Sequence, residues 1–189
     1  MLMAAIVVAV LAVGAFVLWG GSGTPADTTA ASTESATEGA KAGEPTPQAI
    51  AAAQAAAALG PHTQETLPPI PFRGYSPPRS PEVVTAAFHF AAEHPEVASF
   101  IPCFCGCENS GHSGNADCFV KSRQPNGDVV EWEEHGVECA VCIDVATRSR
   151  QMNASGASVT AIRASVEKEF APNFPSMTPT PKPTPPASQ

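Results

Sequence analysis

Residues 100–120, FIPCFCGCENSGHSGNADCFV, hold four of the six cysteines of this 189-residue chain, and three of the four alternate with other residues. In an extended chain, alternate side chains share a face and lie about 6.6 Å apart. That spacing is too long for sulfurs that bind one metal ion through bonds of about 2.3 Å. The loop must therefore curl if its thiols act together, and Gly106 allows this because glycine adopts backbone angles that other residues resist. The side chains concerned are Cys103, Cys105, Cys107, His112 and Cys118.

The other two cysteines lie downstream in EHGVECAVCIDVATRSRQM, residues 134–152. We predict a helix from about His135 to Met152. His135, Cys139 and Cys142 are spaced i, i+4 and i+7, which would place their side chains on one face of that helix. One histidine and two thiols would then face the curled loop.

We expect an α+β, mostly α fold: one small domain over residues 67–174, with about three helices, a short β-hairpin and the cysteine-rich loop. Ser80 and Pro81 begin a helix that ends near His94. The Asn-Gly pair in QPNGD is typical of a hairpin between the strands ADCFVKS and VVEWEE. After the helix of residues 135–152, SGASVTAIRASVEKEF predicts a last one. A core of this size is marginal without a staple, so we expect the cysteines to stabilise it.

An uncharged apolar run, residues 2–19, stands at the start of the sequence. As a helix with a rise of about 1.5 Å per residue, it would just span a hydrocarbon core of about 30 Å. We predict that residues 1–19 form a transmembrane anchor, with a cleaved signal peptide as the alternative; no basic residue precedes the run, which favours the anchor. In either case we place the domain outside the cytoplasm, membrane-anchored or, if the segment is cleaved, secreted.

Two low-complexity segments flank the expected domain. Residues 20–66 lack the large apolar side chains that repay chain ordering, so we predict a tether. Within it, PQAIAAAQAAAALG at residues 47–60 has high helix propensity and is either a lone helix or an alanine-rich stretch of linker. Residues 175–189 are rich in Pro and Thr and are predicted to be a disordered tail.

The formal net charge of −8 and the lack of a basic stripe argue against a nucleic-acid partner. No hydrolase-type nucleophile and no phosphate-binding loop stand out, so we do not predict an enzyme, although a redox role stays open. A protein partner stays open, and its identity is not predicted. A c-type haem is disfavoured, because Cys139-Ala-Val-Cys142 is followed by Ile143 and not by histidine.

Three hypotheses account for the six cysteines. The first, which we favour, is a site for a soft transition metal that buffers, delivers or senses the ion; copper and zinc suit thiolates and imidazoles, and an iron–sulfur centre is less favoured outside the cytoplasm. The second is a disulfide-stapled interaction module without metal, for which six cysteines allow 15 connectivities. The third is a thiol–disulfide redox protein. The candidate metal ligands are Cys103, Cys105, Cys107, Cys118, Cys139, Cys142, His112 and His135.

The segments IPCFCGC, GH, DCFV and H…C..C resemble a bacterial family of membrane-anchored or secreted proteins that is named for its Pro-Cys-Tyr-Cys-Gly-Cys motif. The resemblance covers about residues 80–170. Phe104 stands where the motif has tyrosine, so no phenol is available as a ligand there. The family has no settled biochemical function. The resemblance therefore implies an extracytoplasmic location and a cysteine set that acts as one unit, and it implies no activity.

Overall fold

The computed structural model describes residues 39–74 and 76–184. Their fold is mostly helical with one two-stranded antiparallel sheet, as predicted, but it has six α-helices rather than about three. The predicted anchor, residues 1–19, lies outside the described residues, and none of the described helices is long and apolar enough to cross a membrane. The elements are α1 (Pro47–Leu59), α2 (Pro81–Glu93), α3 (Pro95–Ala98), η1 (Cys107–Ser110), η2 (Ala116–Cys118), β1 (Val120–Arg123), β2 (Val129–Trp132), α4 (His135–Glu138), α5 (Ala140–Ala154), α6 (Val159–Phe170) and η3 (Ala171–Asn173).

Helix α2 begins and ends where the sequence predicts. Pro81 takes the first position, where its missing N–H costs nothing, and His94 ends the helix. The buried face carries Phe88, whose ring packs edge-on against Phe119 and Trp132 at centroid separations of 5.1 and 5.3 Å. Offset and edge-on ring pairs of this kind add to the burial of apolar area, so α2 is fixed on the hairpin.

The hairpin is also confirmed. β1 and β2 pair antiparallel with Val120 opposite Trp132, and Gly127 turns the chain between them with a φ of 100°. The first strand is shorter than predicted, because Cys118 lies in the 3-10 turn η2 and not in the strand. That turn brings the Cys118 side chain to the buried side of the hairpin, where it is inaccessible to solvent.

The predicted helix over residues 135–152 is wrong in one respect: it is broken. Cys139 has an extended backbone (φ −102°, ψ 107°) that separates α4 from α5. Gly136 weakens the first segment, since glycine costs a helix about 1 kcal/mol relative to alanine. In an unbroken helix, His135 and Cys142 would be separated by about 10.5 Å along the axis. The break turns α4 away from the α5 axis and brings these two side chains together.

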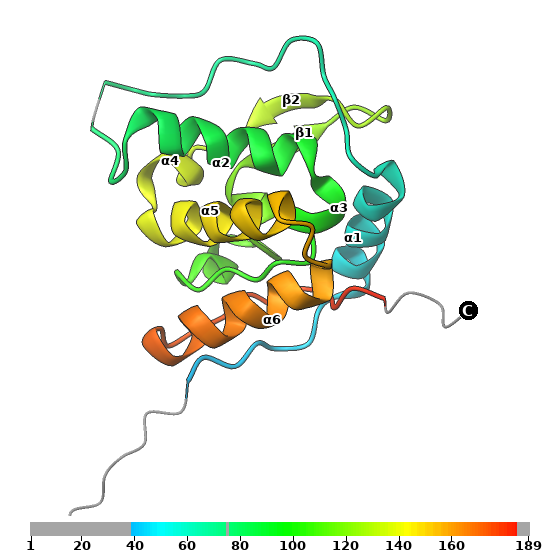
Figure 1. Ribbon diagram of the computed structural model, residues 1–189, viewed down its shortest axis with the longest axis vertical. Helices are drawn as coiled ribbons and strands as arrows, with labels where there is room; N and C mark the ends of the chain where they lie inside the picture. Colours follow the sequence, from blue (N-terminus) through cyan, green and yellow to red (C-terminus); the bar gives the residue numbers. More distant parts are fainter. Residues whose placement is uncertain (1–38, 75, 185–189) are drawn as a thin grey trace, which may run out of the picture. The chain divides into compact units, whose positions relative to one another are not determined.

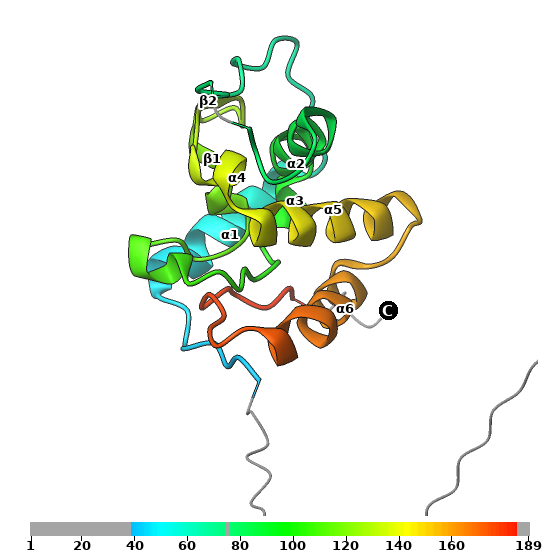
Figure 2. The ribbon, with the colours of Figure 1, turned by 90° about the vertical axis from the view of Figure 1, so that its left-hand side faces the viewer.

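Helix α5 occupies the middle of the fold, with α2 packed on one side and α6 on the other (Figures 1 and 2). α6 is the predicted last helix, and its start is capped by the Ser158 hydroxyl, which accepts a hydrogen bond of 3.3 Å from the Ala161 N–H. Ile143, Ile162 and Val166 are fully buried in the shared core. The cysteine-rich loop reaches the N-terminal end of α5. The central helix of the fold therefore also borders the cysteine cluster.

The C-terminal segment differs from its prediction as a disordered tail. Residues 176–181, here called the strap, lie against the cysteine-rich loop, and Thr178 and Thr180 are 0% and 4% exposed. Arg163 of α6, itself 6% exposed, donates hydrogen bonds to the carbonyls of Thr180 and Pro181 and to that of Phe100. One buried guanidinium thus joins the strap to the start of the loop.

The described end of the predicted tether also packs on the domain. α1 forms, capped by the Thr46 hydroxyl, and it lies against α3 with Ala49 and Ala53 buried (Figure 1). The segment before it lies beside the strap, because Ala42 forms an isolated parallel bridge with Met177. Alanine drift is therefore the wrong one of the two alternatives for residues 47–60.

Candidate metal centre

The cysteine-rich loop curls as the sequence predicts. Gly106 has a left-handed backbone (φ 84°), and the 3-10 turn η1 follows it at once. Gly111 reverses the chain again with a φ of 89°. The Asn109 side chain donates to the Gly106 carbonyl across the turn, at 3.0 Å. The turns at these two glycines thus bring the sulfur atoms of the alternating cysteines close together.

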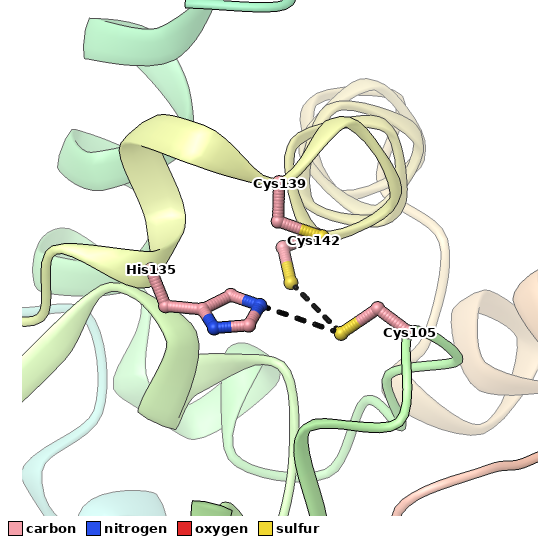
Figure 3. Close-up of side chains that lie close together, drawn as sticks. All are labelled: Cys105, His135, Cys139 and Cys142. Carbon is pink, nitrogen blue, oxygen red and sulfur yellow. Dashed lines mark hydrogen bonds between the residues drawn. The ribbon is translucent and has the colours of Figure 1, made fainter.

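Four side chains meet at the junction of α4 and α5 (Figure 3). The Cys105 sulfur lies 3.6 Å from His135 Nε2 and 3.5 Å from the Cys142 sulfur. Cys139 completes the group, and the four donor atoms all lie within 4.8 Å of one another. We call Cys105, His135, Cys139 and Cys142 the outer group, because its members other than Cys142 are partly exposed.

A second set of side chains gathers around Cys118. Its sulfur lies 3.7 Å from the Cys107 sulfur and 3.6 Å from His112 Nδ1, and the three donor atoms lie within 4.8 Å of one another. The Cys103 sulfur is within 4.8 Å of the sulfurs of Cys107 and Cys118. We call Cys103, Cys107, His112 and Cys118 the inner group, because all three of its cysteines are buried.

The two groups touch. The Cys142 sulfur lies 3.1 Å from that of Cys118 and 3.3 Å from that of Cys103, and Cys103 lies 3.6 Å from Cys105. All eight predicted ligand residues therefore belong to one continuous cluster. All six cysteines are free, and these separations exceed the bond of about 2.05 Å that defines a disulfide.

Crowding strongly perturbs the titration of these side chains. Hydrogen bonds from neighbouring thiols, Cys103 first, hold the pKa of Cys105 well below its usual value. Hydrogen bonds to Cys105 and Cys139 raise the pKa of His135 to about 10, against the effect of burial. Hydrogen bonds with neighbouring thiols, Cys103 first, raise the pKa of Cys142, and burial raises it further. The lowered pKa of Cys105 and the raised pKa of His135 together favour a thiolate beside an imidazolium.

Two residues that the sequence does not single out hold the cluster in place. Thr178 of the strap accepts a hydrogen bond of 2.8 Å from the Cys103 N–H, and its own N–H donates to the Cys103 carbonyl at 2.9 Å. Buried Asn115 donates from Nδ2 to the Cys142 carbonyl at 3.1 Å. A threonine in a Pro/Thr repeat carries no signal of this role. Asn115, a polar residue three positions before a cysteine, carries only a faint one.

Gly136 sets how closely α4 approaches the turn that carries Cys118. A Cβ atom at this position would lie 2.5 Å from the Phe119 ring and 2.6 Å from the Cys118 carbonyl oxygen. Real Cβ atoms do not come so close. The missing side chain therefore allows His135 and Cys118 to belong to one cluster.

The sequence model of a family described as a protein of unknown function with PCYCGC motif matches residues 75–183. The chain belongs to this PCYCGC family. The match extends past residue 174 and includes the strap, so the Thr178 contact lies inside the family domain. Phe104, at the motif's tyrosine position, is buried and stacks on Phe170 at 5.7 Å between ring centroids. No curated protein and no solved structure matches the chain.

Proposed function

We propose that this PCYCGC-family domain binds a soft transition metal, copper or zinc, outside the cytoplasm, tethered to the membrane by residues 1–19. It would buffer, deliver or sense that metal. The observation that carries the proposal is the set of distances between donor atoms. In a tetrahedral site with bonds of about 2.3 Å to sulfur and about 2.05 Å to nitrogen, neighbouring sulfurs are about 3.8 Å apart and a sulfur and a nitrogen about 3.6 Å apart.

Four of the donor–donor separations lie close to that geometry. Cys105–Cys142 and Cys107–Cys118 are 3.5 and 3.7 Å apart between sulfurs. Both sulfur–imidazole separations, Cys105–His135 and Cys118–His112, are 3.6 Å. These values match the edges expected of a ligand polyhedron around one ion, which supports the proposal.

The donor types point to copper and zinc. The four groups of donor atoms that the described residues form contain only cysteine and histidine, with no carboxylate. Thiolate and imidazole donors favour Cu(I) and Zn(II) over hard ions such as Mg²⁺ and Ca²⁺. A bound cation would also stabilise thiolates at Cys107, Cys118 and Cys142, whose pKa values are raised.

The redox hypothesis gains one specific observation. Cys139 is the N-cap of α5 and Cys142 lies in its first turn, and a helix N-terminus stabilises a thiolate. Cys142, however, is fully buried and touches three other cysteines. A disulfide partner would have to displace that whole cluster to reach it, which favours metal binding over thiol exchange.

The test is the metal content and the thermal stability of the full chain, isolated under reducing conditions. We expect bound copper or zinc, and we expect the unfolding temperature to fall when a chelator removes it, because metal binding contributes on the order of 10 kcal/mol to folding at structural zinc sites. His135→Ala should lower metal affinity. His89→Ala is the matched control, since His89 lies half-exposed on α2, outside the cluster, and pairs with Glu93 at 3.8 Å.

A metal-free chain whose unfolding temperature does not respond to chelator would refute the proposal. Intact mass before and after thiol alkylation distinguishes the alternative: a loss of six hydrogens would mean three disulfides and would favour the stapled interaction module.

A further inference from the structure

The outer and inner groups differ in solvent access. In the outer group, Cys105, His135 and Cys139 are partly exposed. In the inner group, Cys103, Cys107 and Cys118 are 0%, 2% and 0% exposed. An incoming ligand can therefore reach three donors of the outer group directly, whereas in the inner group only the imidazole of His112 is partly exposed and the three sulfurs are buried.

The outer and inner groups contain the same number and the same kinds of donor atoms. Each group has three thiols and one imidazole, and in each the imidazole nitrogen lies 3.6 Å from one sulfur. Zinc sites closed by the protein take four such ligands. One four-coordinate ion would leave four donors unused, three of them thiols, in a crowded and partly buried cluster. Two ions with four donors each would use all eight, with Cys103 added to the inner group through its proximity to Cys107 and Cys118.

The boundary between the groups supports the same division. Cys142 of the outer group lies 3.1 and 3.3 Å from Cys118 and Cys103 of the inner group. Both separations are clearly shorter than the roughly 3.8 Å expected between two sulfurs of one tetrahedral ion. These short contacts do not fit Cys142 together with Cys118 and Cys103 around one tetrahedral ion, which supports placing Cys142 in the outer group.

The inner group is also held more firmly. Cys103 is joined to the strap by two hydrogen bonds through Thr178. The backbone of Cys118 packs closely against Gly136 of α4, where a Cβ atom would lie 2.6 Å from the Cys118 carbonyl oxygen. Release of an inner ion therefore requires the strap or α4 to separate from the loop. Release of an outer ion can begin by ligand substitution at the partly exposed Cys105, His135 and Cys139, because only one of its four donors, Cys142, is buried.

We propose that the cluster binds two metal ions with different roles: the outer ion exchanges with partners, and the inner ion is structural. This inference rests on the proposed metal-binding function and adds the number of ions, their ligands and the one that is delivered. The outer site would pass its ion to another thiolate or imidazole ligand, one donor at a time, through Cys105, His135 and Cys139.

Zn(II) is the probe for the test. The full chain is loaded with Zn(II) under reducing conditions, and the zinc is then withdrawn by a chromophoric chelator in excess. We expect two zinc ions per chain and two phases of equal amplitude, the slow one at least tenfold slower. Cys139→Ser should remove the fast phase and leave one zinc, Cys107→Ser should remove the slow phase, and the control His89→Ala should keep both.

The outcomes are distinguishable. A chain that binds no zinc or copper refutes the proposed function and this inference together. A chain that binds one ion, or that releases two ions in a single phase, overturns only the inference. The stoichiometry and the two phases of the unmodified chain decide the matter even if Cys107→Ser does not fold.

Discussion

The Cys118 and Cys142 sulfurs lie 3.1 Å apart, although one belongs to the turn before the hairpin and the other to the first turn of α5. This contact joins the two halves of the domain at its centre. Any change that moves either element must disturb the cluster, so the stability of the fold and its capacity for metal should vary together. Substitutions at positions that are not metal ligands can test this coupling between fold stability and metal binding.

Thr178→Val removes the hydroxyl that accepts the Cys103 N–H bond and keeps the shape of the side chain. A buried donor left without a partner costs about 1–3 kcal/mol, so we expect the free energy of unfolding to fall by that amount, with faster loss of metal. Chemical denaturation of the metal-loaded chain measures the first effect. Thr160→Val on the exposed face of α6 is the control, and equal effects from the two variants would contradict a role for the strap.

Gly136→Ala places a methyl group 2.5 Å from the Phe119 ring. Overpacking of this kind costs about 1–3 kcal/mol, and relief requires α4 to move away with His135. We expect lower stability and weaker metal binding, read from thermal unfolding with and without chelator. Gly43→Ala introduces the same methyl where nothing lies within 4 Å and should be neutral. A Gly136→Ala chain as stable as the unmodified one would show that the approach of α4 is not constrained.

Arg163→Met removes the guanidinium that donates to the carbonyls of Phe100, Thr180 and Pro181. Hydrogen bonds to charged groups contribute about 1.5–3 kcal/mol each, and we expect a loss of roughly 3 kcal/mol together with release of the strap. Hydrogen exchange should then accelerate at the Thr178 amide, which donates to Cys103. Arg150→Met, at an exposed position of α5, should leave that amide protected, and protection that survives in Arg163→Met would count against the strap.

Local signals predicted much of this structure. Pro81 and the Asn126-Gly127 pair act on their immediate neighbours, so α2 and the hairpin could be placed from the sequence. Gly106 allowed the curl of the loop to be expected. The eight cysteine and histidine residues could be grouped because a metal site requires many soft donors in one place.

The rest depends on contacts between distant segments. The break at Cys139 leaves no mark on the helical spacing of His135, Cys139 and Cys142, which fits a straight helix equally well. The order of the strap depends on Arg163 and on the backbone of Cys103, neither of which is visible in a Pro/Thr-rich composition. Burial of polar side chains by long-range partners is the kind of information that a single sequence does not carry.

The central claim is that the cysteine and histidine cluster is a metal site, and X-ray absorption at the metal edge of the loaded full chain tests it most directly. We predict a first shell dominated by sulfur at about 2.3 Å, with a minority of nitrogen at about 2.0–2.1 Å, near three sulfurs and one nitrogen for each ion. A first shell made only of nitrogen and oxygen would contradict the account.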